Sequence, residues 1–287
     1  MSATETQRVL PIEGVIRNEL AELVRDSELS IPSLPDSATG LMGLSGFSDP
    51  VVSKVASAAE RSPLLRERVL RVAALAAQRD ISGFSSVHEA IAHLGAAEVA
   101  DIVVTAMVHG RLFDDKRCAG VAVDAWRRSI ATAIWAREIG ALSRRGDEYT
   151  YLSGLLHDIG QHVAKLACAW SAVRLGLDPE DANSERAAQD HGHHFASIVC
   201  TQWPLPDAVI VAMRDWASWT PAEGDPGNPA VVQLAHYLAE IAYEQGPELT
   251  REALAGKPLL DTLRISPDRF NALLSRAGWV KAQAAAY

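Results

Sequence analysis

The chain of 287 residues is long enough to bury a large core and to form one or two domains. Its composition, 48% hydrophobic and 22% charged, is ordinary for a globular protein in water. The formal net charge of −9 disfavours a general role in binding nucleic acid or an anionic membrane. No apolar run approaches the ~18 residues of a membrane span, and residues 1–10 lack the apolar core of a secretory signal.

The cysteines are few and scattered. Cys118, Cys168 and Cys200 lie far apart and form no C-x-x-C pattern. An odd number of isolated cysteines favours reduced thiols over a disulfide framework. We therefore predict a cytoplasmic protein.

Helix signals begin near the N-terminus. Residues 1–30 carry apolar positions at helical spacing, which predicts a short amphipathic helix before a Pro-rich turn at 31–35. Ser62 is a typical N-cap, and Pro63 suits the first position of a helix. The sequence therefore predicts a helix that starts at these two residues.

A second start signal follows with its own stop. Ser86 and Glu89 have the spacing of a capping box, and Gly95 is a typical helix end. A further helix is predicted over 97–108. The charged stretch 111–120 is the expected boundary between two helical lobes.

The remainder of the chain also has helical periodicity, separated by polar loops at 178–184 and 221–229. Helices are predicted around Trp126–Arg137, over 151–166, from the crowded histidines His191, His193 and His194 to Trp203, and after Pro206, Asn228 and Ser266–Pro267. No alternating strand pattern of useful length is present, so the fold class is predicted to be all-α, with two packed helical lobes.

The most informative stretch is 151–166, YLSGLLHDIGQHVAKL, which we interpret as one helix with a buried stripe. His157 and Asp158 lie within that stripe. Burying such a pair is costly unless the two are satisfied by partners or bind a metal. Imidazole and carboxylate together suit zinc, iron and manganese. A bare His-Asp dipeptide leaves open the simpler interpretation, a satisfied histidine beside a capped or salt-bridged aspartate.

The longer string from Gly154 to Gly160, GLLHDIG, resembles the signature of the HD superfamily, whose enzymes are metal-dependent phosphohydrolases. The order of several motifs resembles, more narrowly, the HDOD family, the HD-related output domain of bacterial signalling proteins. The motifs are the Pro32–Pro35 turn and the segments 60–65, 81–95, 126–129 and 203–206.

The resemblance implies an HDOD domain over 31–242. Its first lobe would span about 31–115 and its HD-like helical bundle about 116–242. Helical extensions are expected at 1–30 and 243–287.

The resemblance also identifies a degenerate HD site. Catalytic relatives hold one metal with an earlier histidine, the His-Asp pair and a later aspartate. The matching positions here are Arg128, the pair His157 and Asp158, and His236. Arginine cannot donate a lone pair to a metal, and its charge repels a divalent ion. We therefore predict that Arg128 pairs with Asp158 and closes a relic site.

No cofactor is expected, and no metal is assigned. If a metal did bind, its ligands would come from His157, Asp158, His236, His191 and His193. Histidines that crowd a helix start are more often solvated or locally hydrogen-bonded than metal-bound.

The sequence leaves three classes of function to compare. The resemblance and the missing ligands favour a non-catalytic signalling module that acts through protein–protein contacts. We expect no receiver, cyclase or phosphodiesterase domain in this chain, so its partners would be signalling proteins in trans. A small-molecule ligand between the lobes stays open as a second kind of partner.

The alternative is a metal-dependent HD-type phosphohydrolase acting on a nucleotide or cyclic dinucleotide, which would need a metal to activate water. A nucleic-acid-binding regulator would need a basic face, and the Arg clusters at 66–71, 127–128 and 144–145 are better interpreted as solvated helix faces. No membrane association is expected.

Overall fold

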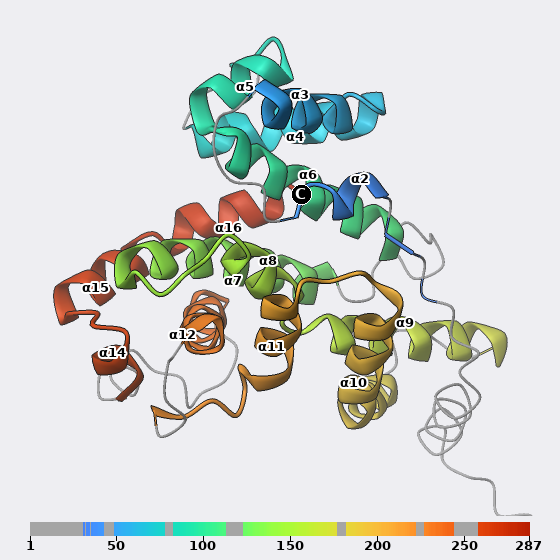
Figure 1. The fold of residues 1–287 in the computed structure, drawn as a ribbon. Helices are drawn as coiled ribbons and strands as arrows, with labels where there is room; N and C mark the ends of the chain where they lie inside the picture. Colours follow the sequence, from blue (N-terminus) through green and yellow to red (C-terminus); the bar gives the residue numbers. More distant parts are fainter. Residues whose placement is uncertain are drawn as a thin grey trace, which may run out of the picture.

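The computed structural model describes residues 31, 33–34, 36–42, 49–77, 83–112, 123–176, 182–221, 227–243 and 258–287, and every regular element in these ranges is a helix (Figure 1). The all-α prediction is thus confirmed for this part of the chain. The predicted helix at 1–30, Cys118 and most of the predicted boundary at 111–120 lie outside these ranges.

The first helices pack on one another at one end of the molecule, with α3, α4 and α5 above α6 in Figure 1. They are α2 (Asp36–Thr39), α3 (Asp49–Ala59), α4 (Pro63–Ala76), α5 (Val87–Leu94) and α6 (Ala96–Leu112). The predicted start of α4 is confirmed, because Ser62 Oγ accepts a hydrogen bond from the N–H of Leu65 and Pro63 is the first helical residue.

The ends of α5 also follow from local chemistry. Ser86 Oγ accepts from the N–H of Glu89, as the capping box requires. The Glu89 carboxylate instead accepts from the N–H and hydroxyl of Ser85, one residue earlier than predicted. Gly95 ends the helix with a φ of 96°, a conformation that costs glycine little.

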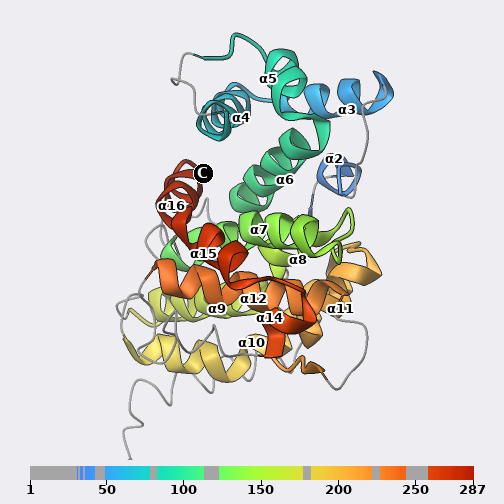
Figure 2. The ribbon, with the colours of Figure 1, turned by 90° about the vertical axis from the view of Figure 1, so that its left-hand side faces the viewer.

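The second group of helices begins with α7, which lies next to α6, and the other helices of the group lie on the far side of α7 (Figure 2). It comprises α7 (Val123–Ser143), α8 (Thr150–Leu156), α9 (Ile159–Arg174), α10 (Ala182–Gln202), α11 (Asp207–Asp215) and α12 (Gly227–Ala242). The middle of α7 is buried all round, from Ser129 to Ala136. A helix without a polar face belongs at the centre of a core, and here α8 and α12 cover it.

Helix α10 begins earlier than the sequence indicated. Residues 182–184 are helical rather than part of a polar loop, so His191, His193 and His194 lie in the middle of the helix and not at its start. The stretch 182–189 is polar, yet it is rich in Ala, Glu, Arg and Gln, which all favour helix. Polarity here was therefore a poor guide to loop structure.

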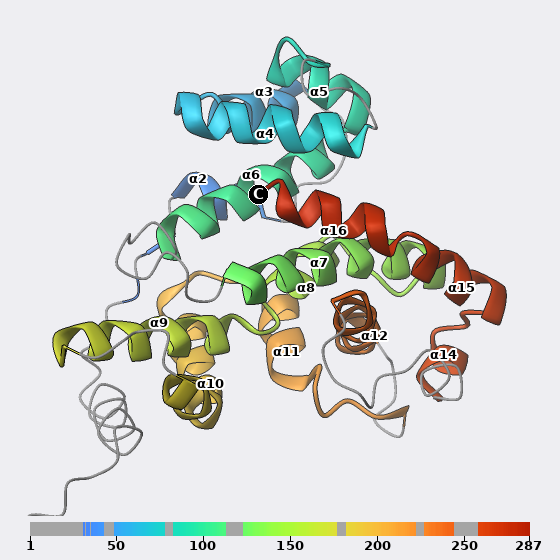
Figure 3. The same cartoon turned by 180° about the vertical axis from the view of Figure 1, so that it is seen from behind.

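The C-terminal helices fold back onto the molecule. They are α14 (Pro258–Thr262), α15 (Pro267–Ser275) and α16 (Ala277–Ala285), and Ser266 caps α15 as predicted. Helix α16 runs along α7 and also contacts α4, so it touches both helical groups (Figure 3).

Candidate functional site

The pair His157–Asp158 separates two helices. Helix α8 ends at Leu156 and α9 begins at Ile159, so the prediction of one continuous helix over 151–166 is wrong at this point. Asp158 leaves the helical conformation with φ −115° and ψ 20°. The apolar residues on both sides are buried, and for this reason the hydrophobic pattern does not reveal the break.

Ring N–H groups satisfy the backbone carbonyls of this turn. The Gly154 carbonyl accepts from His157 Nδ1 at 2.7 Å, and the Asp158 carbonyl accepts from His162 Nδ1 at 2.7 Å. Trp216 Nε1 donates to the His157 carbonyl at 3.1 Å. Because a carbonyl oxygen can only accept, both imidazoles must carry their proton on Nδ1.

His157 then has a second partner across the bundle. Its Nε2 lies 3.1 Å from Nδ1 of His236, which comes from α12. A neutral imidazole protonated at Nδ1 has a lone pair at Nε2, so His236 is the donor in this bond. Both ring nitrogens of His157 are therefore occupied by protein contacts.

Burial keeps these imidazoles neutral. It lowers the pKa of His162 to about 4. Burial, and then the Arg128 guanidinium, lower the pKa of His236 to about 4. The pKa of His157 falls well below its usual value through burial and then through the neighbouring His236. Neutral rings agree with the proton positions deduced from the hydrogen bonds.

The described carboxylate that pairs with Arg128 belongs to Glu240, with Nε and Oε1 3.3 Å apart. Both side chains are largely buried, at 25% and 18% exposed. The predicted ion pair between Arg128 and Asp158 is therefore wrong. Glu240 lies one helical turn beyond His236 on α12. Because α12 packs against α7, the Glu240 carboxylate lies beside the Arg128 guanidinium.

Among the described residues, no cation forms an ion pair with the Asp158 carboxyl. Burial raises its pKa to about 7, and the positive charges of Lys165 and Arg128 oppose that rise without cancelling it. Near neutral pH this carboxyl is thus only partly ionised. Arg128 acts on it through space and not through a shared hydrogen bond.

A cavity of about 310 Å³ brings the predicted site residues together. We call it the HD pocket. It is lined by Ala125, Arg128, Ser129, His157, Asp158, Gln161, His162, Lys165, Gln189, His236 and Glu240. The convergence of Arg128, His157, Asp158 and His236 agrees with the positions taken from the motif order.

The other two candidate histidines lie apart from the HD pocket. His193 lines a different, more apolar cavity with Cys200 and Met213, and His191 does not line the HD pocket. Sequence reasoning also missed His162, Lys165 and Glu240. His162 had a usable signal, because it follows the His-Asp pair by one helical turn, but Glu240 lay outside every motif.

The donor set fits a metal poorly. Among the residues that the structure describes, no three histidine, cysteine or acidic side chains converge to form a metal site. His157 has no lone pair to offer while it bonds Gly154 and His236, and the Arg128 guanidinium would repel a divalent ion. The side chains of the HD pocket as they are arranged here therefore do not fit a metal ion.

Comparison with family models shows the family of the chain. The family model described as HDOD domain matches residues 31–217 of the chain. The chain belongs to the HDOD family. A comparison with curated proteins finds no match.

Solved structures share the fold of this HDOD protein. A protein of Shewanella amazonensis SB2B, provisionally named a metal-dependent phosphohydrolase, is 18% identical with a TM-score of 0.66 over 95% of this chain and 99% of its own. An HDOD domain protein of unknown function from Geobacter sulfurreducens is 16% identical, with a TM-score of 0.65 over 94% and 98%.

A third structure, from Marinobacter aquaeolei VT8, is provisionally named a signal transduction protein. It is 22% identical, with a TM-score of 0.61 over 97% of this chain and 67% of its own. Within the described residues, none of the helices is both long and apolar enough to cross a bilayer.

Proposed function

We propose that this HDOD protein is a non-catalytic regulatory module that acts in the bacterial cytoplasm through contacts with signalling proteins in trans. The observation that carries the proposal is the state of the HD pocket. His157 has both nitrogens engaged within the protein. The resemblance matches the position of Arg128 to a metal-binding histidine of catalytic relatives, and here this position carries a guanidinium paired with Glu240. Membrane and nucleic acid are not among the partners that we propose.

The proposed module spans 31–242. Its first lobe, at about 31–115, corresponds to the helices around α6, and its HD-like lobe, at about 116–242, to those around α7. The proposed C-terminal extension is 243–287, and the described helices in it are α14, α15 and α16, of which α16 contacts both groups. The other proposed extension, at 1–30, precedes the first lobe.

The test of catalysis is a hydrolysis assay. Purified protein with added Mn²⁺ or Fe²⁺ should hydrolyse bis(p-nitrophenyl) phosphate and p-nitrophenyl phosphate no faster than the His157→Ala variant. Turnover that His157→Ala abolishes would overturn the proposal. Affinity capture of the full chain from its native bacterium should then yield signalling proteins, and capture of metabolic enzymes alone would contradict the signalling role.

The alternative function is a metal-dependent phosphohydrolase, which the polar lining of the HD pocket favours. The metal content of protein purified without chelator separates the two. Stoichiometric iron, manganese or zinc, lost in Asp158→Ala, would support the enzyme.

The double variant Arg128→His with His236→Asp rebuilds the ligand set of catalytic relatives. The first change removes the repelling guanidinium, and the second frees Nε2 of His157 from its bond to His236. We expect tight Mn²⁺ or Fe²⁺ binding by the double variant and weaker binding by either single variant, measured by equilibrium dialysis. Equal binding by the unmodified protein would contradict the relic-site interpretation.

A further inference from the structure

A second cavity, of about 300 Å³, lies where α6 of the first helical group meets α7 and α8 of the second. We call it the junction pocket. It is lined by Ala97, Asp101, Arg137, Gly140, Ala141, Gly146, Asp147, Glu148, Thr150 and Tyr151. None of these residues belongs to the HD pocket, and the function proposed above does not use them.

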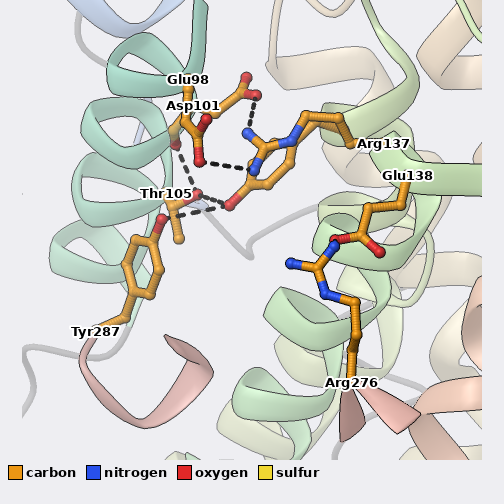
Figure 4. A network of polar contacts seen from close by, with 8 residues as sticks. Glu98, Asp101, Thr105, Arg137, Glu138, Arg276 and Tyr287 are labelled. Carbon is orange, nitrogen blue, oxygen red and sulfur yellow. Dashed lines mark hydrogen bonds and ion pairs between the residues drawn. The ribbon is translucent and has the colours of Figure 1, made fainter. Parts of the chain in front are cut away.

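The guanidinium of Arg137, which lines this pocket, already pairs with two carboxylates. Arg137 Nη2 lies 3.0 Å from Glu98 Oε1, and Arg137 Nη1 lies 3.3 Å from Asp101 Oδ2. Its guanidinium carbon also sits 5.3 Å from the centre of the Tyr151 ring. Figure 4 shows the guanidinium between the two carboxylates of α6. The two carboxylates largely neutralise the positive charge of Arg137, so an anionic ligand would gain little from it.

Carboxylates exceed cations around the cavity. The lining includes Asp101, Asp147 and Glu148 against the single guanidinium of Arg137. The described contacts of the Asp101 carboxylate involve Oδ2, and those of the Asp147 carboxylate involve Oδ1. Glu148 is exposed at the rim. The pocket therefore favours a ligand with positive charge.

The pKa of Asp101 also indicates that negative charge exceeds positive charge in the pocket. Burial raises the pKa of its carboxyl to about 7, although the adjacent Arg137 guanidinium lowers it. One shared cation does not fully compensate the buried carboxylate, and a second cation would stabilise its ionised form.

The remainder of the lining is small or apolar. Gly140 and Gly146 face each other so closely that a β-carbon on Gly146 would lie 2.8 Å from the Gly140 Cα. Bare backbone therefore forms part of the wall, together with Ala97, Ala141 and the Tyr151 ring. A short aliphatic or aromatic group fits such a surface.

We propose that the junction pocket binds a small organic cation, a primary amine or guanidinium compound with a short apolar body, whose charge pairs with Asp101 and Glu148. The ligand would bridge α6 to α7 and α8 and so stabilise the packing of the two helical groups. This site goes beyond the proposed function, since it would exist whether or not the HD pocket is catalytic.

The test uses the full chain with agmatine and tyramine as probes. The controls are their uncharged counterparts, 1,4-butanediol and tyrosol, in which hydroxyl groups replace the cationic groups. Isothermal titration calorimetry should give one site for at least one of the two amines, and the uncharged counterpart of that amine should bind at least tenfold more weakly. Absence of binding by both amines up to 10 mM, or equal binding by the uncharged counterpart, would overturn the proposal.

Variants locate the site. Asp101→Asn keeps an oxygen that accepts from Arg137 and should weaken binding at least tenfold. Exposed positions guard against misfolding, since Glu148→Gln should weaken binding and Ala141→Trp should block it, both without changing the Tm of the free protein. Asp268→Asn, an exposed change on α15, is the matched control and should bind as the unmodified chain does. Unaltered affinity in Asp101→Asn and Ala141→Trp would contradict the placement.

Discussion

At the scale of single residues, the partner of Arg128 determines what its removal should do. The guanidinium forms an ion pair with Glu240, and both side chains are largely buried. Removing either one leaves the other charge poorly solvated, which usually costs more than removing both. Asp158, by contrast, has only a longer-range electrostatic interaction with Arg128.

We therefore expect strong coupling between Arg128 and Glu240. In a double-mutant cycle with Arg128→Met and Glu240→Gln, urea unfolding should give a coupling free energy of about 1 kcal/mol or more. The matched cycle of Arg128→Met with Asp158→Asn should give a clearly smaller value. Larger coupling to Asp158 would restore the pairing expected from sequence and contradict the structure.

Sequence identified four residues of the HD pocket but not their contacts. Arg128, His157, Asp158 and His236 were placed by motif order, and all four line one cavity. Their partners depend on where each side chain points after the helices pack. Glu240 is part of no motif, and its contact with Arg128 arises only when α12 lies against α7.

At the scale of elements, the turn between α8 and α9 depends on distant residues. Trp216, which donates to the His157 carbonyl, is 59 residues further along the chain. Capping boxes and Pro starts act within a few residues, so α4, α5 and α15 were predicted at the correct start. A break that depends on a remote side chain has no local sequence signal.

Gly160, at the start of α9, permits its close packing on α10. A β-carbon at Gly160 would collide with the carbonyl oxygen of Gly192 and lie 2.7 Å from the Ala196 side chain. Backbone cannot move aside cheaply, so the packed helices would have to separate.

Gly160→Ala should therefore destabilise the protein by about 2 kcal/mol or more, measured by urea unfolding. Gly278→Ala is the matched control, because a β-carbon there meets nothing within 4 Å and the residue is exposed on α16. The control should leave stability unchanged or raise it by at most about 1 kcal/mol, through better helix propensity. Equal effects at both sites would show that the α9–α10 contact is looser than described.

At the scale of the whole molecule, polar contacts join the two helical groups. Arg137 of α7 bonds Glu98 and Asp101 of α6. Tyr151 of α8 contacts the Thr105 hydroxyl of α6 at 3.0 Å and the Tyr287 hydroxyl at 3.5 Å. Helix α16 adds a second connection, and Arg276, just before it, pairs with Glu138. The contact between the two groups thus includes several ionisable side chains besides the shared apolar core.

Asp101 should make the stability of this junction depend on pH. Its carboxyl interacts with the charges of Glu98 and Arg137 and with the hydroxyls of Tyr151 and Tyr287. Its pKa is raised from 3.8 to about 7, chiefly by burial. The folded protein therefore holds a proton that the unfolded chain releases above pH 3.8. This contribution is fully present below the unfolded pKa and is lost as pH rises through the folded pKa.

We therefore expect Asp101→Asn, which mimics the neutral carboxyl, to gain stability relative to the unmodified protein as pH rises from 5 to 8. The relative change should approach at most about 1.4 kcal/mol per pH unit below the folded pKa and level off above it. Urea unfolding at constant ionic strength measures it, with Asp268→Asn as the surface control. The stability of Asp101→Asn relative to the unmodified protein could instead stay constant with pH, or increase as pH falls. Either result would mean that Asp101 is fully ionised in its pairing with Arg137.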